Sequence, residues 1–320
     1  MRTPSCDSSS GRAKAVERLA DQHGAAWTDD VSGWLGTSAA DCVDVVVVAT
    51  PSGTHADIIV PALEAGKHVL VEKPIEVSLE AADRIIEAER RTGNVVAVVS
   101  QHRFDAATER VVEAVRAGRL GRLTSAIASC AWWRPQSYYD GGAWRGTREL
   151  DGGGAVMNQG IHVVDLLLAV MGEPVQVFAR TRLLAHEGVE VEDTAVATVE
   201  FAGGALGVLH ATTAAFPGLE SSLRIHGDQG SAVILDNELV YLGTGHVVDE
   251  RPDEVGDAVS AGGLGPAHVA QLRDLVALVR AREAGDATAR PRVGTADGRR
   301  ALALVLAMYE SARSGQPVRL

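Results

Sequence analysis

Short apolar runs alternate with amphipathic segments over the first hundred residues. Residues 43–50, 68–71 and 95–100 are rich in valine and lack polar alternation, which is typical of parallel strands buried on both faces. Residues 55–65 and 78–92 between them have helical spacing. Strands separated by single helices predict a right-handed βαβ sheet. Ahead of the first strand, the pattern predicts a helix over about 11–23 and a short strand near 25–27.

The second half of the chain has a different period. Small or polar residues alternate with larger apolar ones, and Gly203-Gly204 and Asp228-Gln229-Gly230 are hairpin signals. The predicted strands are 123–133, 175–184, 193–201, 205–213, 222–226 and 231–235. This pattern predicts a mostly antiparallel sheet of about six strands. A helix at 161–171 interrupts the strands, two helices at 267–284 and 297–313 close the chain, and 251–266 has the composition of a loop.

Composition excludes several classes of function. The chain has 320 residues, of which 46% are hydrophobic, so a large core is possible. A formal net charge of −12 without a basic block argues against nucleic acid as a partner. No apolar run reaches the roughly 18 residues that a membrane span needs, and the N-terminus has no secretory pattern. Three scattered cysteines, Cys6, Cys42 and Cys130, predict no metal site and a reducing, cytoplasmic setting.

Glu72-Lys73-Pro74 follows the predicted strand at 68–71. A lysine at the carboxyl end of a parallel strand points into the crevice where open α/β sheets bind ligands. Its ammonium can bind a hydroxyl and stabilise an oxyanion, and proline makes the turn rigid. The alternative is a solvated lysine in an ordinary β-turn.

His162 begins the helix at 161–171, with Asp165 three residues later and Asn158 four residues earlier. If the helix extends back to 158, the three side chains lie near one face. A neutral imidazole there can take a hydroxyl proton while Lys73 holds the oxygen. The alternative is a histidine satisfied by backbone groups. The preceding Asp151–Gly154 run is either a loop that approaches a ligand closely or a simple turn.

An aromatic and basic stretch precedes this loop. Five of the nine Trp and Tyr residues fall within thirteen positions, namely Trp132, Trp133, Tyr138, Tyr139 and Trp144. Arg134 and Arg145 are interleaved with them. Stacking rings and guanidinium groups suit a polyhydroxylated or phosphorylated ligand. The same residue types are enriched at subunit interfaces, so both interpretations stay open.

Taken together, these motifs resemble the Gfo/Idh/MocA oxidoreductases, named for glucose–fructose oxidoreductase and inositol dehydrogenase. The resemblance covers almost the whole chain from Asp7 onward. It is carried by the segments 49–55, 65–74, 101–104, 120–123 and 151–165. Segments 144–147 and 192–195 look most like members that act on nucleotide-linked sugar acids.

The resemblance implies hydride transfer between NAD, with NADP not excluded, and a hydroxyl carbon of a sugar, sugar acid or cyclitol. Lys73 would be the catalytic lysine and His162 the acid/base. Asn158 stands where many members carry an aspartate, so it would orient groups without carrying charge. Pro74 is expected to follow a cis peptide. The implied cofactor-binding residues are Asp7, Thr50, Pro51, His55, Glu72, Lys73, Arg103, Trp144 and Arg145. The implied substrate-binding residues are Lys73, Asn158, Asp165, His162 and Tyr139.

The resemblance also implies a fold of type α/β plus α+β. Residues 1–104 would form an N-terminally incomplete Rossmann domain, and 105–320 a domain with a large, mostly antiparallel sheet. One free face of that sheet would pack on a second copy, giving a homodimer or homotetramer.

The chain departs from the family pattern at its start, where no Gly-x-Gly-x-x-Gly turn precedes the strand at 43–50. That strand would lose a partner and expose an apolar edge. We hypothesise that Met1 is not the natural start or that the chain is truncated, and a genuine short form would bind cofactor weakly.

The departure keeps other interpretations open. A non-catalytic relative would act as a binding or regulatory protein. A biliverdin-reductase-like or dimeric dihydrodiol-type enzyme would keep hydride transfer and change the substrate. NAD is favoured because Asp7 would accept from a 2′-hydroxyl and repel a 2′-phosphate, although Arg12 lies nearby.

Overall fold

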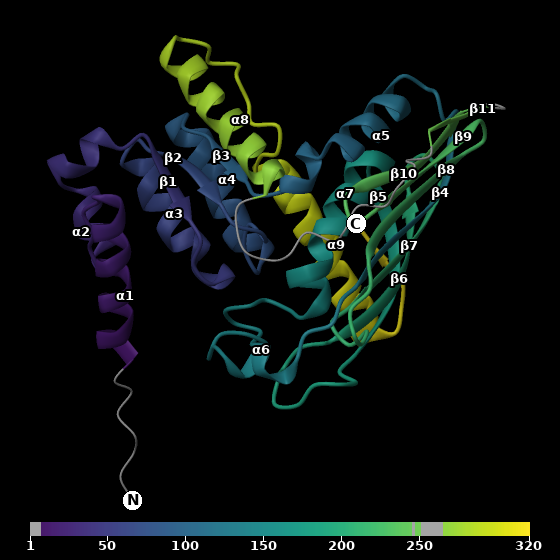
Figure 1. Cartoon of the computed structure of the whole chain (residues 1–320), viewed down its shortest axis with the longest axis horizontal. Coiled ribbons are helices and arrows are strands. Elements are labelled where there is room, and N and C mark those ends of the chain that lie inside the picture. Colours follow the sequence, from purple (N-terminus) through teal and green to yellow (C-terminus); the bar gives the residue numbers. More distant parts are fainter. Residues whose placement is uncertain (1–7, 245–246, 251–264) are drawn as a thin grey trace, which may run out of the picture. The chain divides into compact units, whose positions relative to one another are not determined.

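The computed structural model describes residues 8–244, 247–250 and 265–320, in two compact units, Met1–Asp44 and Val45–Leu320 (Figure 1). The described part of the first unit holds α1 (Ser8–His23), α2 (Val31–Leu35) and a 3-10 turn (Ser38–Cys42). The strand predicted at 25–27 is wrong, because this segment has no strand partner and Ala25 N still bonds Ala20 O at 2.9 Å. Asp7 lies outside the described residues.

The second unit begins with a three-stranded parallel sheet. Its strands are β1 (Val45–Val48), β2 (His68–Val71) and β3 (Val96–Val98), in the order β1-β2-β3. Helices α3 (His55–Glu64) and α4 (Leu79–Thr92) connect them, so the predicted βαβ pattern is confirmed. Ser78 caps α4 by accepting from Ala81 N at 3.2 Å, and Gly93 ends it in the left-handed conformation. β1 is an edge strand whose Val47 is 60% exposed.

A nine-stranded sheet forms the larger part of the second unit. Its strands are β4 (Leu123–Ala131), β5 (Pro174–Arg182), β6 (Thr194–Phe201), β7 (Leu206–Thr212), β8 (Ser221–Gly227), β9 (Gly230–Leu235), β10 (Glu238–Thr244), β11 (Val247–Glu250) and β12 (Val318–Arg319). The order is β11-β10-β9-β8-β4-β7-β6-β5-β12, and only β4 and β7 pair in parallel among these described strands. The mostly antiparallel sheet is therefore confirmed, with three strands more than the sequence predicted.

Two long helices cover one face of this sheet, as Figure 1 shows: α7 (Ile161–Met171) packs against β4 and β8, and α9 (Thr295–Ser314) against β5. Ser311 on α9 accepts a hydrogen bond from Ala179 N of β5 at 3.0 Å. The remaining helices are α5 (Ala106–Arg116), α6 (Gln136–Asp140) and α8 (Pro266–Glu283). Most of the loop predicted at 251–266 lies outside the described residues. α5 was not predicted.

The opposite face of the nine-stranded sheet is apolar and exposed. Ile127, Phe178, Val196 and Val208 come from four strands, and each is 37% to 49% exposed. Ile127 and Val208 are direct neighbours across β4 and β7. This face is therefore continuous across the strands, as expected for a sheet whose two sides have different surroundings.

In the part of the chain that the structure describes, no helix combines the length and apolar character needed to cross a membrane. The same residues contain no cluster of histidine, cysteine and carboxylate side chains suited to a metal ion. The domain boundary near residue 104 stays a prediction.

Candidate active site

Lys73 and His162 line one cavity, although they are 89 positions apart in the sequence. Lys73 follows β2, and the Lys73–Pro74 peptide bond is cis, as the resemblance implied. His162 is the second residue of α7. Ser100, Ile161 and other residues that follow or flank β3 and α7 complete the cavity wall. The structure thus brings an amine and an imidazole together beside the carboxyl end of a parallel strand.

Lys73 is partly buried as a residue, and its ammonium is held by the backbone of Asn158. Lys73 Nζ donates to Asn158 O at 2.9 Å. Burial lowers the pKa of Lys73, while the negative charges of Glu72 and Asp151 oppose this shift and Arg134 adds to it. The hydrogen bond to Asn158 O therefore fixes the position of the amine. The charges of two carboxylates, Glu72 and Asp151, and of one guanidinium, Arg134, act on it there.

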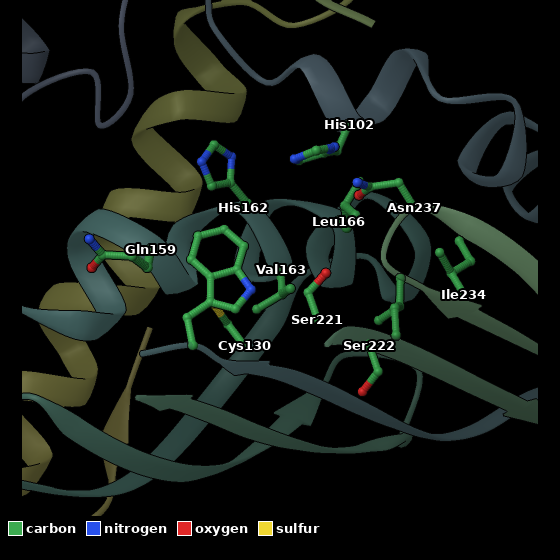
Figure 2. Close-up of a pocket in the computed structure, with 12 residues that line it drawn as sticks. His102, Cys130, Gln159, His162, Val163, Leu166, Ser221, Ser222, Ile234 and Asn237 are labelled. Atoms are coloured by element: carbon green, nitrogen blue, oxygen red, sulfur yellow. The ribbon is translucent and has the colours of Figure 1, made fainter. Parts of the chain in front are cut away.

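The His162 ring is set up as a neutral imidazole. Burial, and then the neighbouring charge of Lys73, lowers its pKa well below the usual range. His102 lies beside it, with the two ring centroids 5.2 Å apart, as Figure 2 shows. His102 Nδ1 is 2.8 Å from a carboxylate oxygen of Asp105. The pocket in Figure 2 continues from these rings toward Cys130 on β4 and Ser222 on β8. A neutral imidazole can accept a proton from a bound hydroxyl.

Asn158 lies in a π-helical turn, Val156–Gly160, that continues directly into α7. The helix therefore does extend back to Asn158, but with a wider turn. Asn158 Nδ2 donates to Asp151 Oδ1 at 2.5 Å and to Gly153 O at 3.2 Å. Its side chain is tied to the glycine loop, and its role in substrate binding stays a prediction.

Asp165 and Arg103 form a buried ion pair. Arg103 donates to both oxygens of Asp165, from Nε at 2.7 Å and from Nη2 at 2.5 Å. Asp165 also accepts from the Ser100 hydroxyl, and Arg103 Nη1 reaches Asp297 at 3.1 Å. Both charges are engaged within the protein, so this pair fixes α7 relative to the segment after β3. Substrate contact by Asp165 and cofactor contact by Arg103 stay predictions.

The strand ends next to Lys73 present groups that suit the nicotinamide half of a dinucleotide. Thr50 and Pro51 follow β1 and are exposed or half-exposed, and the half-exposed Glu72 follows β2. A hydroxyl and a carboxylate there match the hydroxyls of a ribose. The residues present thus fit the nicotinamide–ribose half of NAD, whereas no glycine-rich turn for the pyrophosphate precedes β1 in this sequence.

His55 has a different environment from the one the resemblance suggested. Its ring is fully buried, with Nε2 3.0 Å from Thr50 O and Nδ1 3.1 Å from Pro74 O. The ring therefore braces the loop after β1 against the turn that carries Lys73. Direct contact of His55 with a cofactor stays a prediction.

The glycine loop is shaped by close packing against the protein itself. A Cβ on Gly154 would lie 1.7 Å from Glu192 O, and Gly152 has φ +77. Glu192 accepts from Gly154 N and Val156 N at 3.1 and 3.0 Å, and from the Tyr309 hydroxyl at 3.0 Å. The sequence left open whether these glycines let the backbone approach a ligand. In the structure, the backbone at Gly154 approaches Glu192 of the protein itself.

The residues just before the glycine loop contact the turn after β1. Gly53 N, in the turn after β1, donates to Leu150 O at 3.0 Å. A Cβ on Gly53 would lie 2.2 Å from Glu149 O, so only glycine allows this contact. The loop after β1 and the loop before α7 are therefore joined directly.

Two arginines of the aromatic stretch are stacked on rings. Arg134 lies over Trp132 and Tyr138 at 5.3 and 5.4 Å, and Arg145 over Tyr138 and Trp144 at 4.7 and 5.3 Å. The Nε atoms of both arginines are buried with no hydrogen-bond partner among the described residues. A buried donor without a partner is unusual in a folded protein, and the stacked rings hold both guanidinium groups in place.

Tyr139, expected to bind substrate, is buried. Its hydroxyl lies 2.9 Å from Thr213 Oγ1, and burial raises its pKa to about 12. The ring thus packs beneath the aromatic stretch, and its contact with substrate stays a prediction.

Sequence reasoning did not single out three groups next to Lys73 and His162: the Asp151 carboxylate, His102, and Arg134 as a charge that acts on Lys73. Each lies inside a motif that was recognised for another reason, namely the glycine loop, the aromatic stretch and the segment 101–104. Their side-chain directions depend on irregular backbone, which no periodicity reveals.

An ammonium after the parallel strand β2 and a neutral imidazole at the start of α7, in one cavity, form a candidate active site of the kind a dehydrogenase requires. Comparison with known families agrees. The NAD-binding Rossmann domain of the oxidoreductase family matches residues 5–100, and the GFO/IDH/MocA C-terminal domain matches 108–233. The chain belongs to the Gfo/Idh/MocA family of oxidoreductases, and both the recognised family and the predicted fold class are confirmed.

Individual relatives are distant. The WlbA dehydrogenase of Bordetella pertussis, solved with NADH and UDP-GlcNAcA, is 32% identical with a TM-score of 0.83, over 96% of this chain and 88% of that one. A myo-inositol 2-dehydrogenase of Thermotoga maritima is 29% identical over 87% of this chain and 80% of that protein. A 1,5-anhydro-D-fructose reductase of Ensifer adhaerens is 32% identical over a matched region that covers 60% of this chain and 56% of that protein.

Proposed function

We propose that this protein transfers a hydride between NAD and a hydroxyl carbon of a sugar, sugar acid or cyclitol. The observation that carries the proposal is the shared cavity of Lys73 and His162. Membership of an NAD-binding oxidoreductase family supports it. A non-catalytic binding protein would have no need of a buried amine next to a neutral imidazole.

The protein's own residues handle the oxygen and the proton. Lys73 donates a hydrogen bond to the substrate hydroxyl and stabilises the negative charge that grows on its oxygen. His162, neutral because burial lowers its pKa, accepts the hydroxyl proton. In the reverse direction the imidazolium returns the proton to the oxygen. The Arg103–Asp165 ion pair keeps the His162 helix in place during both steps.

Glu72, Thr50 and Pro51 would hold the ribose and nicotinamide, with Trp144 and Arg145 as further contacts. When bound, NAD supplies the acceptor for the hydride. We propose NAD as the cofactor, with NADP not excluded. This preference depends on Asp7, which lies outside the described residues.

We further propose that the substrate is a nucleotide-linked sugar acid. Arg134 and Arg145 carry buried Nε atoms without partners among the residues described, and the charge of Arg134 acts on Lys73. Guanidinium groups at this position suit a carboxylate or phosphate. The similarity to a WlbA dehydrogenase solved with UDP-GlcNAcA supports the same choice.

We also propose a homo-oligomer, a dimer or a tetramer, because the outer face of the nine-stranded sheet is apolar and exposed. A cytoplasmic location is proposed from the composition.

A substrate screen tests the function. The protein is incubated with NAD and either UDP-linked sugar acids, neutral UDP-sugars, free sugars or inositols, and NADH is followed by absorbance. We expect turnover with the first group and weaker turnover with the matched neutral UDP-sugars. Turnover of inositols or free sugars alone would reject the nucleotide-linked substrate and keep hydride transfer. NADH binding without turnover of any group would favour the non-catalytic alternative.

A further inference from the structure

Asp151 is a buried carboxylate whose charge has no ion-pair partner among the described residues. It is 3% exposed and lies directly before the three glycines of the loop. Asp151 Oδ2 accepts from Gly146 N at 2.7 Å, and Oδ1 accepts from Asn158 Nδ2 at 2.5 Å. A buried carboxylate destabilises the folded protein unless hydrogen bonds or opposite charges compensate it. The groups that surround Asp151 therefore indicate its role.

Asp151 determines which way the Asn158 amide faces. A carboxylate can only accept hydrogen bonds, so the nitrogen of the amide must point toward it. The second amide hydrogen is directed at Gly153 O, 3.2 Å away. Both hydrogens are then used, and Asn158 Oδ1 has no partner among the described residues. This oxygen is left as an acceptor on a half-exposed residue beside Lys73.

Asp151 also balances the charge of Lys73. The backbone oxygen of Asn158 accepts from Lys73 Nζ, so Asn158 links the amine to the carboxylate. Around the amine, Glu72 and Asp151 are negative and Arg134 is positive. Burial raises the pKa of Asp151, and the hydrogen bonds from Gly146 and Asn158, followed by the positive charges of Lys73 and Arg145, oppose that rise and favour the carboxylate. Burial disfavours the ammonium, and Asp151 offsets part of that cost.

We propose that Asp151 is a positioning residue of the active site, which orients the Asn158 amide toward the substrate and supplies the negative charge that position 158 itself lacks. The proposal rests on the function proposed above and adds to it a residue that acts through Asn158. Asn158 Oδ1 then accepts a hydrogen bond from a hydroxyl of the substrate next to the one that reacts. The carboxylate keeps Lys73 protonated while the substrate displaces water from the cavity.

Exchange of the two side chains tests the proposal. In D151N the charge is lost, and the amide at 158 can face either way. In N158D two carboxylates face each other. In the double variant D151N/N158D, the amide introduced at position 151 donates to the carboxylate introduced at position 158. The hydrogen bond between the two side chains and the negative charge are then both present with their positions exchanged, and only the 3.2 Å bond to Gly153 O is lost. Asp57→Asn, on the surface of α3 and paired there with Arg84, is the matched control.

We expect each single variant to lower kcat by about 10-fold to 100-fold, as misplacement of a catalytic group does. The double variant should recover to within about three-fold of the parent, because the two changes are strongly coupled. If Asp151 were only structural, the fold-losses in kcat of the two single variants would multiply in the double variant. Equal kcat in D151N and the parent, or no recovery in a double variant whose melting temperature matches the parent's, would overturn the proposal.

A second measurement does not depend on turnover. The chain has three lysines, Lys14, Lys67 and Lys73, so the rate of acetylation of each can be followed by mass spectrometry across pH. D151N should lower the pH at which Lys73 becomes reactive, the exchanged variant should restore it, and the exposed Lys14 should not change. An unchanged Lys73 profile in D151N would remove the charge role of Asp151. If the parent turned over no substrate, the proposed function would fail while this profile still decided the role of Asp151.

Discussion

At the scale of single residues, the proposed chemistry depends on two groups whose pKa values are shifted by burial. Lys73 is an amine with a lowered pKa, and His162 is an imidazole kept neutral. Neither property belongs to the amino acid itself. Both arise because β2 and α7 bring the side chains into one cavity, where protein atoms surround them.

Replacement of Lys73 tests the oxygen-binding role. K73M keeps most of the side-chain volume and removes the charge, so the oxyanion loses its donor. We expect kcat to fall by on the order of 100-fold to 1,000-fold, as removal of one oxyanion-stabilising donor does. Circular dichroism should be unchanged, and K14M, on the exposed surface of the first unit, is the control. Normal turnover in K73M would remove the lysine from the mechanism.

The lowered pKa of His162 predicts how stability depends on pH. The unfolded chain takes up a proton on this ring near the ordinary value of 6.5, and the folded site does not. The unfolded state therefore binds more protons below 6.5, and the free energy of unfolding decreases as the pH falls through that value. Urea denaturation on both sides of pH 6.5 measures this slope.

His162→Asn should make the slope smaller. The slope should not vanish, because burial also lowers the pKa of His210, which contributes in the same direction. A variant with the parent's full slope would show that the His162 ring is protonated in the folded protein.

At the scale of elements, the conformation of the glycine loop requires residues without a Cβ atom. Alanine at position 154 would put a Cβ 1.7 Å from Glu192 O, and a backbone atom must then move. G154A should lower the free energy of unfolding by about 3 kcal/mol, within the range for overpacking. G203A, in a hairpin with open space around the new Cβ, should change it by less than about 0.5 kcal/mol. Thermal melting of the two variants compares them, and equal melting temperatures would contradict this account of the loop.

The elements themselves were predictable to different degrees. The helix α7 was predicted to the residue, because Gly160 and Gly172 flank a segment of eleven residues that is apolar except for His162 and Asp165. β10 was missed although Asp236 and Asn237 form a tight turn with positive φ, a signal that points to a hairpin. β12 is two residues long and pairs with β5, and no periodicity exists over two residues.

The site shows the same division. The sequence predicted a common site for Lys73 and His162 because each lies next to the boundary of a predicted element, and the structure places both on one cavity. Their catalytic roles stay predictions. The bond between Asp151 and Asn158 was not predicted, because an irregular loop and a π-helical turn separate them, and local geometry decides whether they meet. Recognised motifs therefore located the site, and the structure was needed to connect its charges.

At the scale of the whole molecule, the exposed outer face of the nine-stranded sheet predicts self-association. Light scattering should give the mass of a dimer or a tetramer. Val208→Asp places a charge at the centre of that face and should shift the protein toward monomer. Val16→Asp, on α1 in the first unit and 45% exposed, is the control. A monomeric parent protein would contradict the prediction.

The hydrogen bond from Gly53 to Leu150 has a kinetic consequence. A dinucleotide that settles on the turn after β1 would stiffen the loop leading to Asp151 and Asn158, where the sugar is expected to bind. Each ligand should then raise the affinity for the other by the same factor. Stopped-flow measurement should accordingly show NADH dissociating more slowly when the sugar is bound, by up to the factor that equilibrium titration of the two ligands gives.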